Sequence, residues 1–232
     1  MKVFWIVLIA AAAVAGLTLF VYYYIGILEN VHTKPKPKPG QIRVACVGDS
    51  ITHGAMIVNR AKNSYPRRLQ KLLGSGYCVG NFGFSARTAS ENGDHPYMKE
   101  NLFRESLAFQ PNIVLVMLGT NDSKPYNWNE EAFQSSMRKL IESYAALNTK
   151  PEICLIAPPP AFPVRGKILY DVQDDVIKNK VGPAVKRLAE GFGFKCLDMY
   201  PVFDGKKQLF ADGVHPNKKG ALLFAQNVFK YI

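Results

Sequence analysis

The sequence predicts an α/β domain in which helices cover both faces of a parallel sheet. Two observations support this fold class. Short apolar runs with few charges recur along the chain, and stretches with one apolar helical face lie between them. Strands that alternate with helices in this way form parallel sheets. The five strand-like runs lie at residues 41–47, 77–82, 112–118, 152–157 and 194–197.

Helical patterns occupy stretches between and after these runs. Apolar residues repeat at intervals of three and four over residues 133–147 and again over 177–188, which gives each segment one apolar face. Pro183 lies inside the second pattern and lacks the N–H that a helix interior needs, so we expect a kink or a new helix there. A last helix is predicted from about Asn217 onward.

Composition limits the number of domains and the class of partner. The chain has 232 residues, of which roughly 190 follow the N-terminal segment; these suffice for one α/β domain but not for two. A hydrophobic content of 48% argues against disorder. The net charge of +11 favours anionic neighbours such as phospholipid headgroups. Because no zinc-finger spacing and no aromatic RNA-binding motif is present, nucleic acid is not expected as a partner.

The cysteines indicate buried free thiols. No two of them have the CxxC spacing of a metal or redox site, and each lies in one of the strand-like runs. In such a run a cysteine acts as a small apolar residue; a disulfide between neighbouring strands is the alternative. The four are Cys46, Cys78, Cys154 and Cys196.

An uncharged apolar run over residues 3–28 predicts a transmembrane helix, because it exceeds the roughly 18 residues that signal one. Aromatic residues lie near both of its ends, as at the two faces of a bilayer. A cleaved signal peptide is the alternative, with Ala13-Val14-Ala15 as its cleavage site, but the apolar run continues well beyond that point. We therefore predict an uncleaved anchor over residues 1–29.

A lysine- and proline-rich linker over residues 30–40 separates this anchor from a folded domain over 41–232. The positive-inside rule would place the domain in the cytoplasm, since more lysines follow the apolar run than precede it. Large domains that follow a first apolar segment are nevertheless often exported. We predict the extracytoplasmic side of the membrane.

Four polar motifs follow predicted strands or precede the last helix. The carboxyl ends of parallel strands are where such sheets carry their chemistry. The motifs are GDSIT at 48–52, NFGFS at 81–85, GTND at 119–122 and DGVHP at 212–216.

Each motif has a chemical and a structural interpretation. Ser50 lies in a Gly-led turn between strand and helix, which suits an exposed nucleophile and equally a helix N-cap. Gly83 lets the backbone approach a ligand, and Asn121 can direct its amide at an oxyanion, but both residue types are common in turns. Asp212 lies three residues before His215, which suits a carboxylate that orients an imidazole, or a surface turn.

In this order the motifs resemble the four sequence blocks of the SGNH hydrolase family, the GDSL-type esterases and lipases. The blocks are named after Ser, Gly, Asn and His, which here match Ser50, Gly83, Asn121 and His215. The resemblance covers the chain from about residue 42 onward. It implies a flavodoxin-like three-layer α/β/α domain with a five-stranded parallel sheet, preceded in this chain by the N-terminal transmembrane helix.

The resemblance also implies a Ser-His-Asp triad and no metal or organic cofactor. Ser50 would attack an ester carbonyl, His215 would take its proton and return it to the leaving alcohol, and Asp212 would orient His215. The N–H groups of Ser50 and Gly83 and the side chain of Asn121 would form the oxyanion hole.

The chain departs from the family pattern at Ala86, where many relatives have a glycine. We expect a changed pocket wall there, with Ser85, Arg87 and Thr88 either at the pocket rim or capping a helix. Two other histidines are weaker candidates for the base. Asp94 adjoins His95 directly, and His53 follows Ser50 too closely.

The expected activity is hydrolysis of a short acyl ester, with O-acetylated carbohydrates as the expected substrates. Loops at 124–128 and 158–163 contain aromatic residues that either form platforms for a sugar or pack over the sheet. Acyl transfer to a cell-envelope polymer is one alternative. A catalytically silent module that binds such a polymer is another.

Overall fold

The computed structural model describes residues 14–18 and 35–232. Residues 14–18 form a piece of helix in one unit, and the unit from Lys34 onward contains the sheet. Most of the predicted anchor over 1–29 and part of the 30–40 linker lie outside the described residues. Within the ranges that are described, no helix is long and apolar enough to cross a membrane. The anchor therefore stays a prediction.

The domain contains a five-stranded parallel sheet with the order β2-β1-β3-β4-β5. This is the flavodoxin-like order, as the family resemblance implied. Every predicted strand is confirmed, with bounds that differ by at most one residue at either end. The strands are β1 Ile42–Gly48, β2 Tyr77–Gly83, β3 Ile113–Met117, β4 Glu152–Ala157 and β5 Lys195–Asp198.

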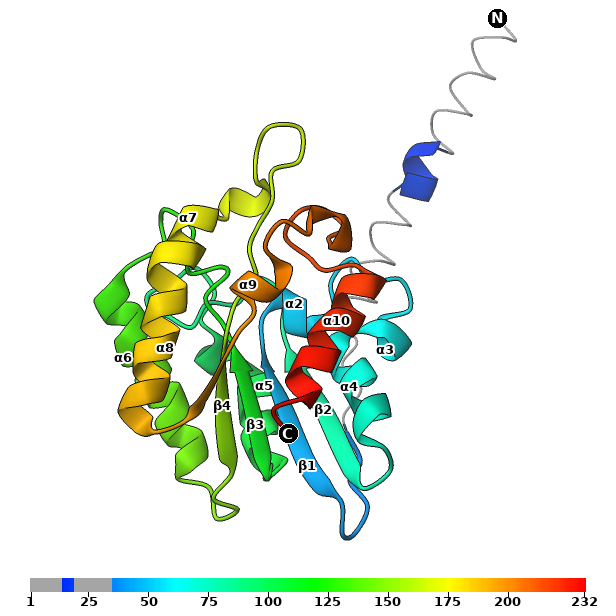
Figure 1. Cartoon of the computed structure of the whole chain (residues 1–232), viewed down its shortest axis with the longest axis vertical. Helices are drawn as coiled ribbons and strands as arrows, with labels where there is room; N and C mark the ends of the chain where they lie inside the picture. Colours follow the sequence, from blue (N-terminus) through cyan, green and yellow to red (C-terminus); the bar gives the residue numbers. More distant parts are fainter. Residues whose placement is uncertain (1–13, 19–34) are drawn as a thin grey trace, which may run out of the picture. The chain divides into compact units, whose positions relative to one another are not determined.

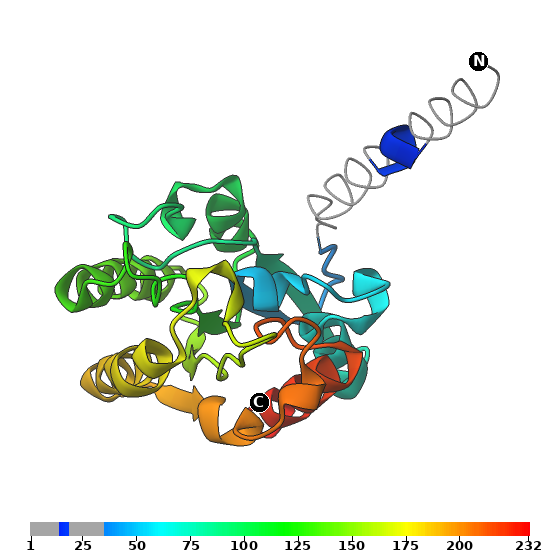
Figure 2. The ribbon, with the colours of Figure 1, turned by 90° about the horizontal axis from the view of Figure 1, so that it is seen from above.

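Helices cover both faces of the sheet, which gives the predicted three layers (Figures 1 and 2). Side chains alternate along β1, so Ala45 and Val47 enter one core while Val44 and Cys46 enter the other. The first core includes residues of α5 Asn101–Ala108, α6 Glu130–Ala145 and α8 Gly182–Phe192; the second includes residues of α4 Tyr65–Leu73 and α10 Lys218–Phe229.

The predicted helices form α6, α8 and α10. Pro183 lies in the first turn of α8, and a π-helical turn at Ile177–Val181 joins α8 to α7 Asp174–Val176. Val181 and Gly182 keep helical dihedral angles, so no separate helix starts at Pro183, and the irregularity predicted there takes the form of the π-helical turn just before it. Asn217 caps α10, because its side-chain oxygen accepts hydrogen bonds from the N–H groups of Lys219 and Gly220.

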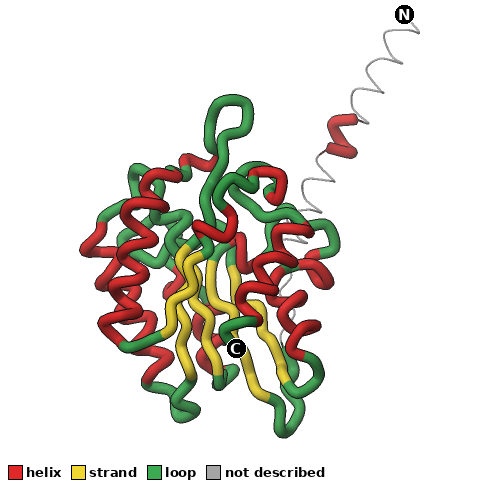
Figure 3. Tube along the Cα trace, in the orientation of Figure 1, coloured by secondary structure: helices red, strands yellow, loops and turns green. Residues whose placement is uncertain are grey.

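Several short elements were not predicted, and most lie in the loops that connect strands and helices. Figure 3 shows many of these loops gathered beyond the carboxyl ends of the strands. They include α2 Ser50–His53, α3 Arg60–Asn63, α9 Tyr200–Phe203 and the 3-10 turns Tyr97–Lys99, Leu169–Asp171 and Lys207–Leu209.

The cysteines lie on four of the five strands and none of them forms a disulfide. Three are buried and Cys196 is half-buried. The interpretation as free, largely buried thiols is confirmed.

Candidate active site

The predicted site residues gather where the strand order of the sheet reverses. β1 and β3 are neighbours in the sheet although β2 separates them in the chain. Ser50 follows β1 and Asn121 follows β3, so both lie at the carboxyl end of this central pair. Ligand sites of open α/β sheets form at such switch points.

Ser50 is the first residue of α2 and is held in a tightly fixed turn. The Asp49 side chain caps this helix by accepting a hydrogen bond from the Ile51 N–H at 2.9 Å. A Cβ on Gly48 would collide with the Thr52 side chain and the Met117 carbonyl oxygen, so only glycine fits there. The turn therefore presents Ser50 at one position above the sheet.

His215 joins Ser50 to Asp212. Its Nε2 lies 2.9 Å from the Ser50 Oγ, and its Nδ1 lies 2.7 Å from Asp212 Oδ2. All three residues are buried. A carboxylate at Nδ1 favours the tautomer with the proton on that nitrogen, which leaves Nε2 free to accept the serine proton.

Asp212 is fixed by backbone hydrogen bonds as well as by the imidazole. Its Oδ1 accepts from the N–H groups of Val214 at 3.0 Å and His215 at 2.8 Å. Burial opposes ionisation, but the hydrogen bond and charge of His215 outweigh it and hold the pKa of Asp212 well below its usual range. The turn also needs Gly213, which has φ 88° and leaves no room for a Cβ beside the Phe162 carbonyl.

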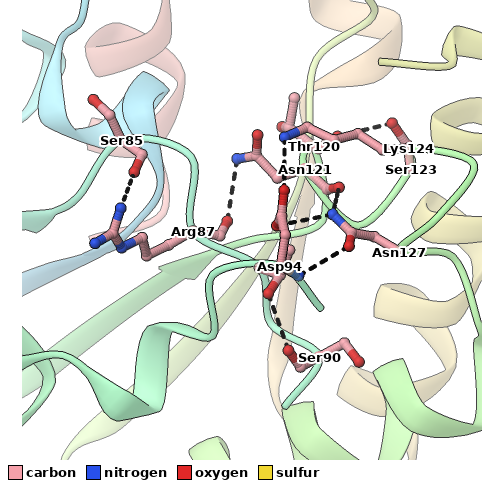
Figure 4. Close-up of polar contacts among 10 residues, drawn as sticks. Ser85, Arg87, Ser90, Asp94, Thr120, Asn121, Ser123, Lys124 and Asn127 are labelled. Atoms are coloured by element: carbon pink, nitrogen blue, oxygen red, sulfur yellow. Dashed lines mark hydrogen bonds and ion pairs between the residues drawn. The ribbon is translucent and has the colours of Figure 1, made fainter. Parts of the chain in front are cut away.

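Asn121 lies in a hydrogen-bonded network, shown in Figure 4. Its Nδ2 donates to the Arg87 carbonyl at 3.1 Å, and because an amide carries two protons, the second remains for a ligand. The Asn121 carbonyl accepts from Asn127 Nδ2 at 3.0 Å. Asn127 in turn is bound to Asp94, which also pairs with Lys124 at 3.3 Å.

Gly83 lies beside the site, but its N–H has another partner. That N–H donates to the Asn81 side-chain oxygen at 3.0 Å. A Cβ on Gly83 would collide with the backbone of α2 at His53, so close packing already explains the glycine. In this geometry the Gly83 amide has no proton to offer an oxyanion, contrary to the role that the resemblance implied.

The loop after Gly83 continues past the turn that carries Ser50. The Phe84 N–H donates to the Gly48 carbonyl at 3.0 Å, which holds the loop against that turn. The next amides are those of Ser85 and Ala86, and neither donates a hydrogen bond within residues 35–232. Ala86 has φ 68°, in the left-handed region.

The other two candidate histidines do not contact Ser50. His53 is buried, its Nδ1 lies 3.2 Å from the Gly83 carbonyl, and its Nε2 contacts Arg60. His95 is exposed in the loop between β2 and α5. Only His215 is placed as a base for Ser50 among these three.

The sequence profile of the GDSL-like lipase/acylhydrolase family matches residues 46–223. The chain belongs to this family. The family predicted from the four motifs is thereby confirmed.

Similar proteins include relatives of known activity and solved structures. An acetylxylan esterase from Xylanibacter ruminicola is 40% identical over 212 residues, which cover 83% of this chain and 43% of that protein. The chain thus spans less than half the length of this relative.

Solved structures show the same fold. They include an aryl esterase from M. smegmatis (TM-score 0.64, 19% identity, covering 82% of this chain and 97% of that one). A carbohydrate acetylesterase from Sinorhizobium meliloti is similar as well (TM-score 0.63, 22% identity, 82% and 98%). A lipase/acylhydrolase from Enterococcus faecalis has a TM-score of 0.65 at 22% identity and covers 83% and 95%.

In this GDSL-family chain, the three residues predicted at the pocket rim differ in their burial and contacts. Thr88 is fully buried and cannot line a rim. Arg87 is half-buried, pairs with Glu100 at 2.7 Å and stacks on Phe84. The Ser85 Oγ is buried without a hydrogen-bond partner among the described residues.

The two aromatic loops also have different roles. Phe162 of the 158–163 loop packs on Phe210, with ring centroids 5.0 Å apart, so this loop covers the sheet as the structural alternative proposed. In the 124–128 loop, Trp128 packs on Phe133 while Tyr126 is 62% exposed.

Sequence reasoning missed Tyr170 and Asn127. The Tyr170 hydroxyl donates to Asp212 Oδ2 at 2.9 Å, from a loop 42 residues earlier in the chain. Nothing in the local pattern distinguishes this tyrosine from other loop aromatics. Asn127 lies six residues after Asn121, and that spacing on a loop has no fixed geometry.

Two buried carboxyl groups, Asp49 and Asp122, lie behind the site. Asp122 accepts the N–H groups of Ala89 and Ser90 at 2.9 and 2.8 Å, which fixes the loop after β2 to the loop after β3. Burial raises the pKa of each carboxyl to about 6, although backbone hydrogen bonds act in the opposite direction. Among the residues described, no group of three or more His, Cys, Asp or Glu side chains is arranged to hold a metal ion.

Proposed function

We propose that this chain is a serine esterase that hydrolyses short acyl esters through Ser50, His215 and Asp212. The observation that carries the proposal is the pair of contacts on His215, 2.9 Å to the Ser50 Oγ and 2.7 Å to Asp212. A serine hydroxyl is a weak nucleophile at neutral pH and needs a base within this distance. His215 meets that requirement, and Asp212 favours its charged form.

The reaction would proceed in two halves. As Ser50 Oγ bonds to the ester carbonyl carbon, its proton passes to His215 Nε2, and the carbonyl oxygen becomes an oxyanion. His215 then returns the proton to the leaving alcohol as the ester C–O bond breaks, which yields an acyl-enzyme. Water attacks the acyl group with His215 again as base, and the acid product leaves while Ser50 regains its proton.

The oxyanion would be bound by the Ser50 N–H, the second amide proton of Asn121 and an amide of the loop at Ser85 and Ala86. These loop amides replace Gly83 in our proposal, because the Gly83 N–H already donates to Asn81. Donors fixed before the reaction stabilise the developing charge without reorganisation. The network that holds Asn121 through Arg87 and Asn127 supports this role.

O-acetylated carbohydrate is the substrate class that we propose. The 40% identity to an acetylxylan esterase supports it. An open pocket of about 400 Å³ lies beside the 168–175 loop, but its lining includes none of Ser50, Asn121, Asp212 and His215, so it does not bear on the substrate class. The lining residues are Pro125, Ile168, Asp171, Val172, Gln173, Asp174 and Asp175.

The experiment is an activity panel on the full chain. The substrates are acetylated xylo-oligosaccharides, 4-nitrophenyl acetate and 4-nitrophenyl butyrate, with Ser50→Ala as the blank. Release of acetate from the oligosaccharides by the native chain alone would support the proposal. Turnover of aryl acetates without any release from the oligosaccharides would retain the esterase and reject the carbohydrate. Ester formation on an added sugar acceptor would favour acyl transfer.

We also propose that residues 1–29 anchor the domain on the extracytoplasmic side of a membrane. The uncharged run over residues 3–28 supports this. The full chain should stay with the membrane fraction through high-salt and carbonate washes, and protease added to intact cells should reach the domain. Recovery of most of the chain in the washes would reject the anchor, and protection from the protease would reject the orientation.

A further inference from the structure

Tyr170 contacts the carboxylate that orients the proposed base. Its hydroxyl donates to Asp212 Oδ2 at 2.9 Å, and the same oxygen accepts from His215 Nδ1 at 2.7 Å. The other oxygen, Oδ1, already accepts two backbone N–H groups. Asp212 therefore has two hydrogen-bond donors on each oxygen, and one of the four is a side chain from a distant loop.

The backbone at Tyr170 adopts a conformation that is rare for a residue with a bulky side chain. Tyr170 has φ 62° and Asp171 has φ 57°, so two consecutive residues with side chains adopt the left-handed region. A bulky aromatic residue rarely adopts it, and strain of this kind tends to occur at functional sites. Core packing does not explain the strain, because Tyr170 is 51% exposed.

The ring of Tyr170 lies beside the imidazole of His215. The two ring centroids are 5.4 Å apart, with an interplanar angle of 66°, which is an edge-on arrangement. One edge of the imidazole is thereby covered by an aromatic ring next to the Asp212 hydrogen bond.

We propose that Tyr170 is a positioning residue that fixes the Asp212 carboxylate and, through it, the His215 imidazole. With donors on both oxygens the carboxylate is held in one orientation, and the imidazole bonded to it at 2.7 Å keeps its Nε2 2.9 Å from the Ser50 Oγ. This role rests on the proposed esterase function.

The test is Tyr170→Phe in the full chain, which removes the hydroxyl and keeps the ring. With 4-nitrophenyl acetate, kcat should fall about 3- to 10-fold, on the scale of one lost hydrogen bond, with KM changed less than twofold. Tyr231→Phe, at a half-exposed tyrosine near the C-terminus, is the matched control and should leave both measurements unchanged.

An NMR spectrum of the His215 Nδ1 proton at a fixed pH gives a reading that does not depend on turnover. Its chemical shift should change in Tyr170→Phe, because Tyr170 and Nδ1 share Asp212 Oδ2, and should stay the same in Tyr231→Phe. If the chemical shift and kcat of Tyr170→Phe both match the native chain, the proposal is wrong. If the native chain turns over no ester while the chemical shift still changes, the esterase proposal fails and the coupling of Tyr170 to His215 stands.

Discussion

The Ser50 hydroxyl and the His215 imidazole lie 2.9 Å apart although 165 residues separate them in the chain. The turn after β1 supplies one, and the loop before α10 supplies the other. α10 packs on α4, and Asn217 fixes the start of α10 just after His215. The contact thus depends on the fold as a whole, and its chemistry can be tested with single substitutions.

Removing either partner of this contact should abolish nearly all activity. Ser50→Ala and His215→Ala should each reduce kcat by several orders of magnitude, and the double variant should be little worse, because the two act as one unit. The measurement is the initial rate of 4-nitrophenyl acetate hydrolysis. A serine-directed phosphonate should label Ser50 in the native chain and in His95→Ala, which is the matched control. Labelling that survives in His215→Ala but is lost in His95→Ala would show that His215 is not the base.

Substitution of the proposed oxyanion donor, Asn121, should lower kcat more than substitution of Asn127, which supports it. Asn121→Ala should lower kcat about 100-fold or more, the scale of one lost oxyanion donor, with a smaller change in KM. Asn127→Ala should lower kcat less, since it removes the 3.0 Å bond that holds the Asn121 carbonyl and the bonds to Asp94 but leaves the Asn121 side-chain amide in place. Steady-state kinetics of both variants would check the order. Equal kcat values for Asn121→Ala and the native chain would make Asn121 a turn residue only.

Ala86→Gly should stabilise the fold. Ala86 has φ 68°, which costs an L-residue roughly 1–2 kcal/mol relative to glycine. Glycine loses more freedom on folding, roughly 0.5–1 kcal/mol, so we expect a net gain of at most about 1.5 kcal/mol. Urea unfolding would measure it. Ala132→Gly in α6 is the opposite control and should destabilise by about 0.5–1 kcal/mol, because that backbone is helical. A loss of stability in Ala86→Gly would show that the turn is not strained.

Asp49→Asn should change how stability depends on pH. The folded carboxyl has its pKa raised from 3.8 to about 6, so the folded chain binds this proton more tightly than the unfolded chain. The stabilisation is present below pH 3.8 and is lost as the pH rises through about 6. The neutral variant avoids that loss, so its stability relative to the native chain should rise by about 2–3 kcal/mol between pH 4 and pH 8.

Urea unfolding at pH 4, 6 and 8 would measure this difference. Asp94→Asn should show almost no change over this range: burial opposes ionisation there, but Asn127 and Lys124 outweigh it and lower the pKa of Asp94, so the stability that its ionisation contributes is lost only as the pH falls below 3.8. A difference between Asp49→Asn and the native chain that stays constant with pH would exclude the buried carboxyl as the cause.

The sequence predicts the sheet well because its signals are local. The inner strands β1, β3 and β4 are largely buried apolar runs, and parallel strands covered on both faces need such runs. The sequence analysis did not predict the shorter helices, because two or three turns contain too few residues to show an apolar repeat, as in α5 Asn101–Ala108. The family resemblance, not local pattern, indicated the order of the strands.

The site residues likewise divide into those that a local motif predicts and those that only the folded chain brings together. The motifs placed Ser50, Asn121, Asp212 and His215 at strand ends or before α10, where the structure has them. Gly83 was assigned to the oxyanion because a glycine suits both close packing and an exposed amide, and only the contact with Asn81 separates these explanations. Tyr170 could not be found, because its hydrogen bond to Asp212 joins two loops that are brought together only by the folded chain.

Alkylation of the four cysteines can measure how readily strands separate from the sheet. Burial raises the pKa of each thiol, so an alkylating reagent will react only slowly while the strands stay paired. Cys78 and Cys196 lie on the edge strands β2 and β5, whereas Cys46 and Cys154 lie on inner strands. Timed alkylation followed by mass spectrometry would therefore rank these strands by the ease with which each leaves the sheet, without any substitution in the chain.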